Sequence, residues 1–114
     1  MGTAGQQKER LATVIKEALQ SLVTKGDLNL ELIPDVSLET PRDKAHGDFA
    51  SNIALILAKP AGKAPRQVAE LIVNALKEYD FIEKIEVAGP GFINFFLTKQ
   101  WLYDVLYHVD QEQL

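Results

Sequence analysis

The sequence predicts an α+β domain, with about four helices packed on a small, mainly antiparallel sheet of three to four strands. Apolar residues recur at helical spacing in several stretches of the chain, and they alternate with polar residues in shorter stretches. A tight turn, Gly89-Pro90-Gly91, separates two of the alternating stretches. Because strands joined by so short a turn run antiparallel, we expect a layer of helices on a sheet.

The first predicted helix ends at Lys25, and Gly26 suits the left-handed position just past a helix C-terminus. Its apolar residues are spaced three and four apart, which places them on one stripe: Leu11, Val14, Ile15, Ala18, Leu19 and Leu22. A first strand is predicted at residues 36–40, where apolar and polar residues alternate before Pro41.

A second helix is predicted from Asp48, whose carboxylate can accept hydrogen bonds from the free N–H groups of a first turn. Its apolar residues are Phe49, Ile53, Ile56 and Leu57, and residues 59–62 end it. A third helix is predicted from Pro65, at a position where a missing N–H costs nothing. Ala64 stands where a Ser or Thr cap is expected, so this helix start should be weaker by about 1 kcal/mol.

Two further strands are predicted around Ile85 and Val87 and at residues 92–97, on either side of the Gly-Pro-Gly turn. Thr98 can cap a last helix, in which Trp101 and several aliphatic residues share one side.

Length and composition limit the kinds of protein that this chain can be. The 114 residues suffice for one domain, and the absence of cysteine excludes disulfides and thiolate metal sites. No signal peptide or membrane-spanning segment is visible, so we expect a cytoplasmic protein without a membrane partner. The net charge of −4 argues against a stand-alone nucleic-acid binder, because such domains neutralise phosphates with a basic surface.

The stretch at residues 92–97 carries the most informative pattern. Side chains alternate between the two faces of a strand, so one face is uniformly apolar and the other presents an amide between two aromatic rings. The two sets are Ile93, Phe95 and Leu97, and Phe92, Asn94 and Phe96. An aromatic ring can stack on any base, and an Asn amide can pair with the edge of an adenine. The alternative is that these aromatic residues only pack and that Asn94 is a hydrogen-bonded strand residue.

Two other clusters have a functional and a structural interpretation. His46 and Asp48 could share a proton or bind a metal, but a turn residue and a helix cap explain them better, and no third ligand or recognisable nucleophile is near. We therefore predict no catalytic and no metal-binding residue. Lys59, Lys63 and Arg66 could meet a phosphate, although three charges in a loop are usually only solvated.

Three stretches together resemble a known family: HGDFASN at residues 46–52, LAKPAGKAPR at residues 57–66 and VAGPGFINF at residues 87–95. They are similar to the additional N-terminal domain of bacterial arginyl-tRNA synthetases. The resemblance implies that residues 1–114 form a single tRNA-binding domain that contacts the D-loop at the outer corner of tRNA(Arg). It implies stacking of an unpaired adenosine on Phe92 and pairing with Asn94, with further contacts from the turn at Gly89 and Gly91.

The family's HIGH-type and KMSK-type catalytic motifs do not occur in this sequence. The resemblance therefore implies a non-enzymatic fragment of a class I arginine–tRNA ligase, whose catalytic and anticodon-binding domains lie outside it. Its expected partners are tRNA(Arg) and the enzyme's own catalytic domain, with no DNA. No cofactor is expected in the fragment, whereas ATP with magnesium is expected for the parent enzyme.

Two alternatives remain at this point. One is a protein-interaction or spacer domain that docks through Phe92 and Phe96 and makes no RNA contact. The other is an independent small hydrolase that uses His46 and Asp48.

Overall fold

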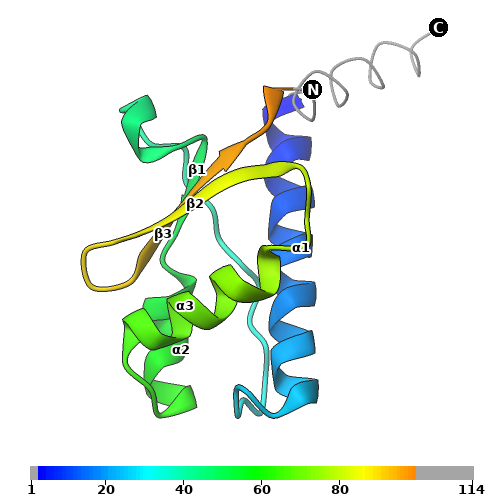
Figure 1. Ribbon diagram of the computed structural model, residues 1–114, viewed down its shortest axis with the longest axis vertical. Helices are drawn as coiled ribbons and strands as arrows, with labels where there is room; N and C mark the ends of the chain where they lie inside the picture. The colour runs from blue at the N-terminus through cyan, green and yellow to red at the C-terminus, as the bar shows by residue number, and fades with distance from the viewer. Residues whose placement is uncertain (1–2, 100–114) are drawn as a thin grey trace, which may run out of the picture.

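The computed structural model describes residues 3–99 of the chain. Its elements, in chain order, are α1 (Thr3–Lys25), the short 3-10 helix η1 (Lys44–His46), β1 (Phe49–Ser51), α2 (Ile53–Ala61), α3 (Pro65–Leu76), β2 (Ile82–Ala88) and β3 (Phe92–Leu97), as Figure 1 shows. No helix in this part of the chain has the length and apolar character needed to cross a lipid bilayer.

The sheet has three antiparallel strands in the order β1-β3-β2, so β3 lies in the middle. Phe95 of β3 pairs with Phe49 of β1 on one side and with Ile85 of β2 on the other. The prediction of an α+β fold with a small antiparallel sheet is therefore confirmed.

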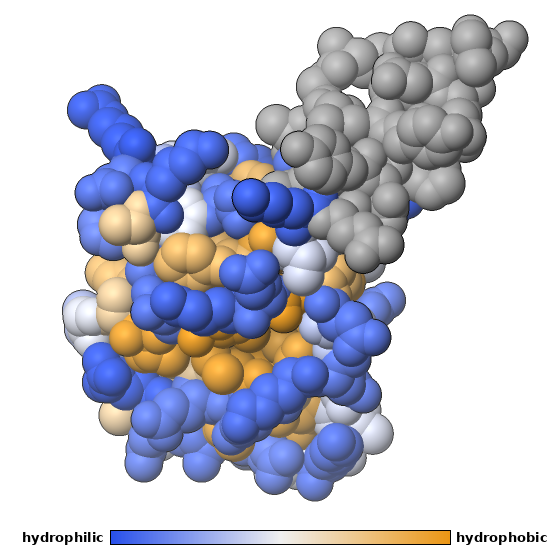
Figure 2. All heavy atoms as spheres, turned by 45° about the horizontal axis from the view of Figure 1, so that its top comes forward, coloured by the Kyte–Doolittle hydropathy of each residue, from blue (hydrophilic) through white to orange (hydrophobic). Residues whose placement is uncertain are grey.

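The hydrophobic core lies between one face of this sheet and the helices. Helix α3 packs against α1, α2 and β2, and α2 also contacts β3. The buried side chains of β3 that face this core are Ile93, Phe95 and Leu97. The apolar stripe of α1 is buried too, since Leu11, Ile15 and Leu19 are fully inaccessible. Other apolar side chains reach the surface, and Figure 2 shows some of them gathered in the middle of one side, framed by hydrophilic residues.

The number of helices differs from the prediction. The described residues contain three α-helices where about four were expected, and the predicted last helix with Trp101 lies outside the described residues. The strand predicted at residues 36–40 is wrong, because only Glu39 pairs there, through a single bridge to Ala50. The neighbouring strand β1 is three residues long, so it offers almost no edge for a fourth strand to pair with.

The helix predicted from Asp48 begins five residues later, at Ile53. Phe49 and Ser51 instead alternate toward the core in β1, and the Ser51 hydroxyl accepts a hydrogen bond from the Ile53 N–H at 3.1 Å. Asp48 is therefore not a helix cap. Its N–H donates to the Phe95 carbonyl at 2.8 Å, and its Oδ2 accepts from the Leu97 N–H at 2.8 Å.

Replacing Asp48 with alanine is expected to lower the free energy of unfolding by about 1–3 kcal/mol, because the partly buried N–H of Leu97 loses its acceptor. Urea unfolding of the purified chain measures this loss. Asp43→Ala is the matched control, since the Asp43 carboxylate also accepts a backbone hydrogen bond, from Ala45 at 2.9 Å, but in an exposed place. We expect about 0.5–1 kcal/mol for the control. Equal losses would show that the hydrogen bond from the Leu97 N–H to Asp48 stabilises the fold no more than an exposed one does.

The start of α3 is better capped than the sequence suggested. The Gln67 side chain accepts a hydrogen bond from the Ala64 N–H at 3.1 Å, and Pro65 occupies the first helical position. This is the half of a capping box that does not need a hydroxyl at Ala64. The Gln67 hydrogen bond therefore compensates for the weakness expected of this helix start. Pro65 and Arg66, at the start of α3, lie against the β2–β3 hairpin.

Candidate nucleic-acid interface

The face of the sheet that points away from the core is the candidate site, and we call it the outer sheet face. Alternation along β3 places Phe92, Asn94 and Phe96 there, opposite the buried set. Residues that pair directly share a face, so the strand register adds the neighbours Ala50, Lys84, Glu86 and Ala88. The predicted division of β3 into two faces is confirmed.

Phe92 lies at the start of β3 with 43% of its surface exposed, and it is one of three large apolar side chains among residues 3–99 that are exposed, with Leu32 and Ile56. It follows the hairpin turn, where a Cβ atom built on Gly89 would lie 3.8 Å from the ring Cδ2. The ring is therefore open to solvent beside the turn and can be reached by a flat ligand.

The sequence predicts that Asn94 is presented on this face between two aromatic rings, yet only 7% of Asn94 is exposed. As a residue of the central strand it is paired with Ala50 on one side and with Glu86 on the other. Within residues 3–99 the Asn94 side chain makes no hydrogen bond. Every fully enclosed side-chain oxygen or nitrogen of these residues does have a hydrogen-bond partner, so the Asn94 amide is not fully enclosed. The amide therefore keeps a narrow opening to solvent.

Phe96, at the other end of this row, is covered by a cation. The Lys84 ammonium lies 4.8 Å from the centroid of the Phe96 ring and 3.2 Å from the Glu86 carboxylate. Phe92 and Phe96 thus do not form one open apolar patch, which weighs against a protein-docking surface built on these two rings. The outer sheet face also has no strong basic field, since Lys84 is balanced by Glu86.

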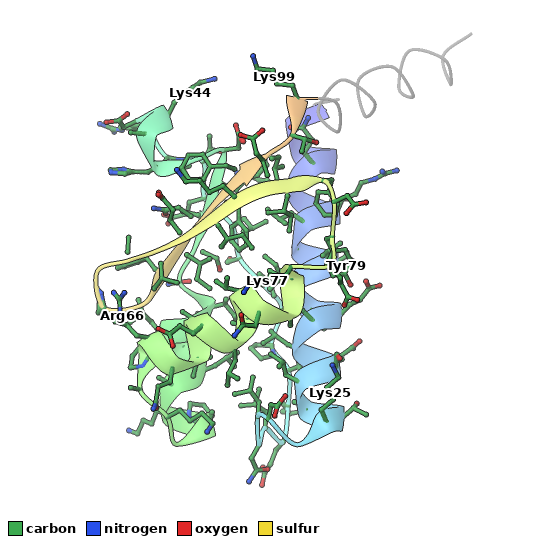
Figure 3. The ribbon with its side chains drawn as sticks, viewed as in Figure 1. Lys25, Lys44, Arg66, Lys77, Tyr79 and Lys99 are labelled. Atoms are coloured by element: carbon green, nitrogen blue, oxygen red, sulfur yellow. The ribbon has the colours of Figure 1, made fainter. Side chains whose placement is uncertain are left out.

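The hairpin turn is held against the start of α3. Gly91 has φ 151° and is buried, and a Cβ atom there would lie 2.8 Å from the Cβ of Pro65. Gly89, with φ 57°, is exposed, and its carbonyl accepts a hydrogen bond from Arg66 Nη1 at 2.7 Å. Figure 3 shows Arg66 at the tip of the hairpin. Gly89 is thus accessible to a partner, whereas the structure explains Gly91 by close packing; RNA contacts at both positions stay predictions.

His46 and Asp48 do not form a catalytic pair in the structure. His46 is exposed in η1, the Asp48 carboxylate is used by the Leu97 N–H, and no hydrogen bond joins the two side chains. Among the described residues no three His, Asp or Glu side chains gather as a metal site would require. Burial raises the pKa of Tyr79, with Glu17 and Glu78 adding to the effect, but Tyr79 lies at the far end of α3 from Arg66 (Figure 3).

A largely apolar groove of about 720 Å³ lies elsewhere, between the loop after α1 and helix α2. It is lined by Asn29, Glu31, Leu32, Ile33, Pro34, Ile56, Leu57 and Pro60. Leu32 is 84% exposed at this groove, and sequence reasoning did not single it out. Glu31 is the only ionisable residue in the lining, so the groove offers no catalytic pair.

Comparison with known proteins gives one consistent family. The family described as arginyl tRNA synthetase N terminal domain matches residues 9–97. An arginine–tRNA ligase of Alcanivorax borkumensis is 50% identical over 99 residues, which are 87% of this chain and 17% of that protein. One from Acetivibrio thermocellus is 44% identical over 107 residues, which are 93% of this chain and 19% of that protein. The chain therefore spans less than a fifth of the length of these relatives.

A solved structure has the same fold. The crystal structure of arginyl-tRNA synthetase from Plasmodium falciparum matches with a TM-score of 0.71 and 17% sequence identity, covering 87% of this chain and 17% of that one.

Proposed function

The chain belongs to the family of arginyl-tRNA synthetase N-terminal domains, and we propose that it recognises the D-loop at the outer corner of tRNA(Arg) as part of a longer arginine–tRNA ligase. In this proposal the arginylation, with ATP and magnesium, takes place in a catalytic domain beyond this chain, in the cytoplasm. The chain itself supplies binding and no catalytic group.

Two residues on the same face of β3 carry the proposal. The ring of Phe92 is exposed, and the Asn94 side chain makes no hydrogen bond within residues 3–99. Two residues apart on a strand, they lie about 7 Å from each other along the chain direction. A base that stacks on the Phe92 ring can therefore turn its edge toward the amide. An Asn amide donates one hydrogen bond and accepts another, which matches the N6 and N7 positions of adenine.

The narrow opening above Asn94 adds selectivity to this arrangement. Ala50 and Glu86 pair with Asn94 on either side and only 7% of Asn94 is exposed, so we expect the edge of a base, and not its face, to reach the amide. An adenine that is paired in a helix cannot present that edge together with an open face for stacking. The site therefore suits an unpaired loop nucleotide, which is what proteins most often read in RNA.

The charge of the chain limits how tightly it binds alone. Its net charge is −4, and the Lys84 ammonium on the outer sheet face is already paired with Glu86. Contacts to phosphates supply most non-specific RNA affinity. We therefore expect the isolated chain to bind tRNA weakly at physiological salt and to depend on the rest of the ligase for affinity.

Replacing Phe92 with alanine is expected to lower kcat/KM for tRNA(Arg) in the longer ligase by a factor that corresponds to about 1–3 kcal/mol, because the stacking platform is lost. Asn94→Ala is expected to lower it as well, through loss of the base-edge hydrogen bonds. Aminoacylation kinetics with varied tRNA measure both effects.

The matched control is Leu32→Ala, which removes another exposed apolar side chain, 84% accessible, at the separate groove. It should leave tRNA kinetics unchanged. If Phe92→Ala and Asn94→Ala both charge tRNA as well as the unchanged ligase, the stacking and pairing mechanism is wrong. Adding tRNA to the isotope-labelled chain gives an independent check, since a spacer domain without RNA contact would leave the Phe92 and Asn94 amide signals in place.

A further inference from the structure

Arg66 is a basic residue that the fold brings to the hairpin turn before Phe92. It extends from the first turn of α3, and its Nη1 donates to the Gly89 carbonyl at 2.7 Å. Gly89 in turn is the residue whose Cβ position lies 3.8 Å from the Phe92 ring. Residues 23 positions apart in the sequence thus place a guanidinium group at the hairpin turn that precedes Phe92 (Figure 3).

The Arg66 guanidinium is exposed and is held in one place without being neutralised. The ion pairs among residues 3–99 are Lys16 with Asp35 and Lys84 with Glu86, and neither involves Arg66. A guanidinium has five N–H donors, and the Gly89 carbonyl uses one nitrogen. The remaining donors form a planar fork that matches the oxygens of a phosphate.

We propose that Arg66 binds a phosphate of the RNA backbone next to the nucleotide whose base stacks on Phe92. This inference rests on the proposed function and extends it, because it names the side chain that neutralises the charge of an RNA phosphate at the hairpin tip. A mobile lysine in a loop loses side-chain freedom when it meets a phosphate. Arg66 has already lost part of that freedom, since the Gly89 carbonyl holds it and Gly91 packs the turn against Pro65.

The other role open to Arg66 is that of a tie between α3 and the turn, with no RNA contact. The two roles differ in how they depend on salt. Each phosphate contact contributes about 0.7–0.9 to the slope of log Kd against log salt concentration, because bound counterions are released. A tie that merely holds the turn in place changes affinity without changing that slope.

The test measures Kd of the longer ligase for a tRNA(Arg) transcript over a series of salt concentrations. Arg66→Gln removes the charge and leaves a shorter polar side chain. We expect its salt slope to be smaller by about 0.7–0.9. Arg66→Lys keeps the charge and should keep the slope, with weaker binding because the planar fork is lost. Arg10→Gln, at an exposed arginine of α1, is the matched control and should leave Kd and slope unchanged.

An unchanged slope in Arg66→Gln overturns the inference, whether or not affinity falls. Phe92→Ala, measured in the same series, separates this failure from failure of the proposed function. Weaker binding of Phe92→Ala at an unchanged slope supports base stacking, so an unchanged Arg66→Gln slope would then remove only the phosphate contact. If Phe92→Ala and Asn94→Ala both bind as the unchanged ligase does, D-loop reading by this face fails, and the phosphate proposal fails with it.

Discussion

Replacing Phe95 with alanine is expected to lower the free energy of unfolding by about 3–5 kcal/mol, since the change removes a fully buried ring and leaves a cavity. Phe95 is 0% exposed, pairs with Phe49 and Ile85 in the middle of the sheet, and belongs to the main hydrophobic cluster. Small domains have a total stability of about 5–15 kcal/mol, so a large part of it would be lost. Urea unfolding followed by circular dichroism measures the change.

Phe92→Ala is the matched control for this prediction, because it removes the same side chain from the same strand on the opposite face. With 43% of Phe92 exposed, we expect a loss of about 1 kcal/mol. Equal losses at the two positions would mean that β3 does not separate a packed face from an accessible one. The pair of variants thus tests the division on which the candidate site depends.

Gly47→Ala is expected to cost about 3 kcal/mol or more, because two unfavourable effects combine at this residue. The backbone has φ 95° and ψ −177°, a region that is essentially restricted to glycine. A Cβ atom would also lie 2.6 Å from the carbonyl oxygen of Phe95. The chain has to move away from β3 to admit the methyl group, and this weakens the hydrogen bond between the Asp48 N–H and Phe95.

Gly62→Ala separates these two effects. Gly62 has φ 67° and ψ 31°, and apart from its own and its adjacent residues no described residue has a heavy atom within 4 Å of its Cβ position. The left-handed conformation alone costs about 1–2 kcal/mol for alanine. A thermal or urea unfolding midpoint that falls no further for Gly47→Ala than for Gly62→Ala would contradict the close contact with Phe95.

Periodic patterns predicted the parts of the fold that depend on near neighbours. The stripe of α1, the strand β3 and the Pro65 start of α3 could be read directly, because spacing alone determines which face is apolar. Phe49 was assigned to the wrong element, since it stands four residues before Ile53 and fits a helical stripe. Its pairing with Phe95, 46 positions away, decides that it lies in a strand, and no local pattern contains that information.

The candidate site could be predicted only in part, for the same reason. Alternation along β3 placed Phe92 and Asn94 on one face, but the burial of Asn94 depends on β1 and β2 flanking it. The hydrogen bond from Arg66 to Gly89 joins distant segments and left no local signal. The Gln67 contact to Ala64 was readable, because a Gln three residues after a cap position is a known helix-start pattern.

The central position of β3 has a thermodynamic consequence for the proposed recognition. Asn94 is paired with strands on both sides and Phe92 with β2, so the backbone that carries them has already lost its freedom on folding and is in place before any nucleotide arrives. The entropy lost on association then falls mainly on the loop nucleotide, which has to leave its own stack and become fixed. Differences in D-loop stiffness among tRNAs should therefore change the affinity even where the contacted base is the same.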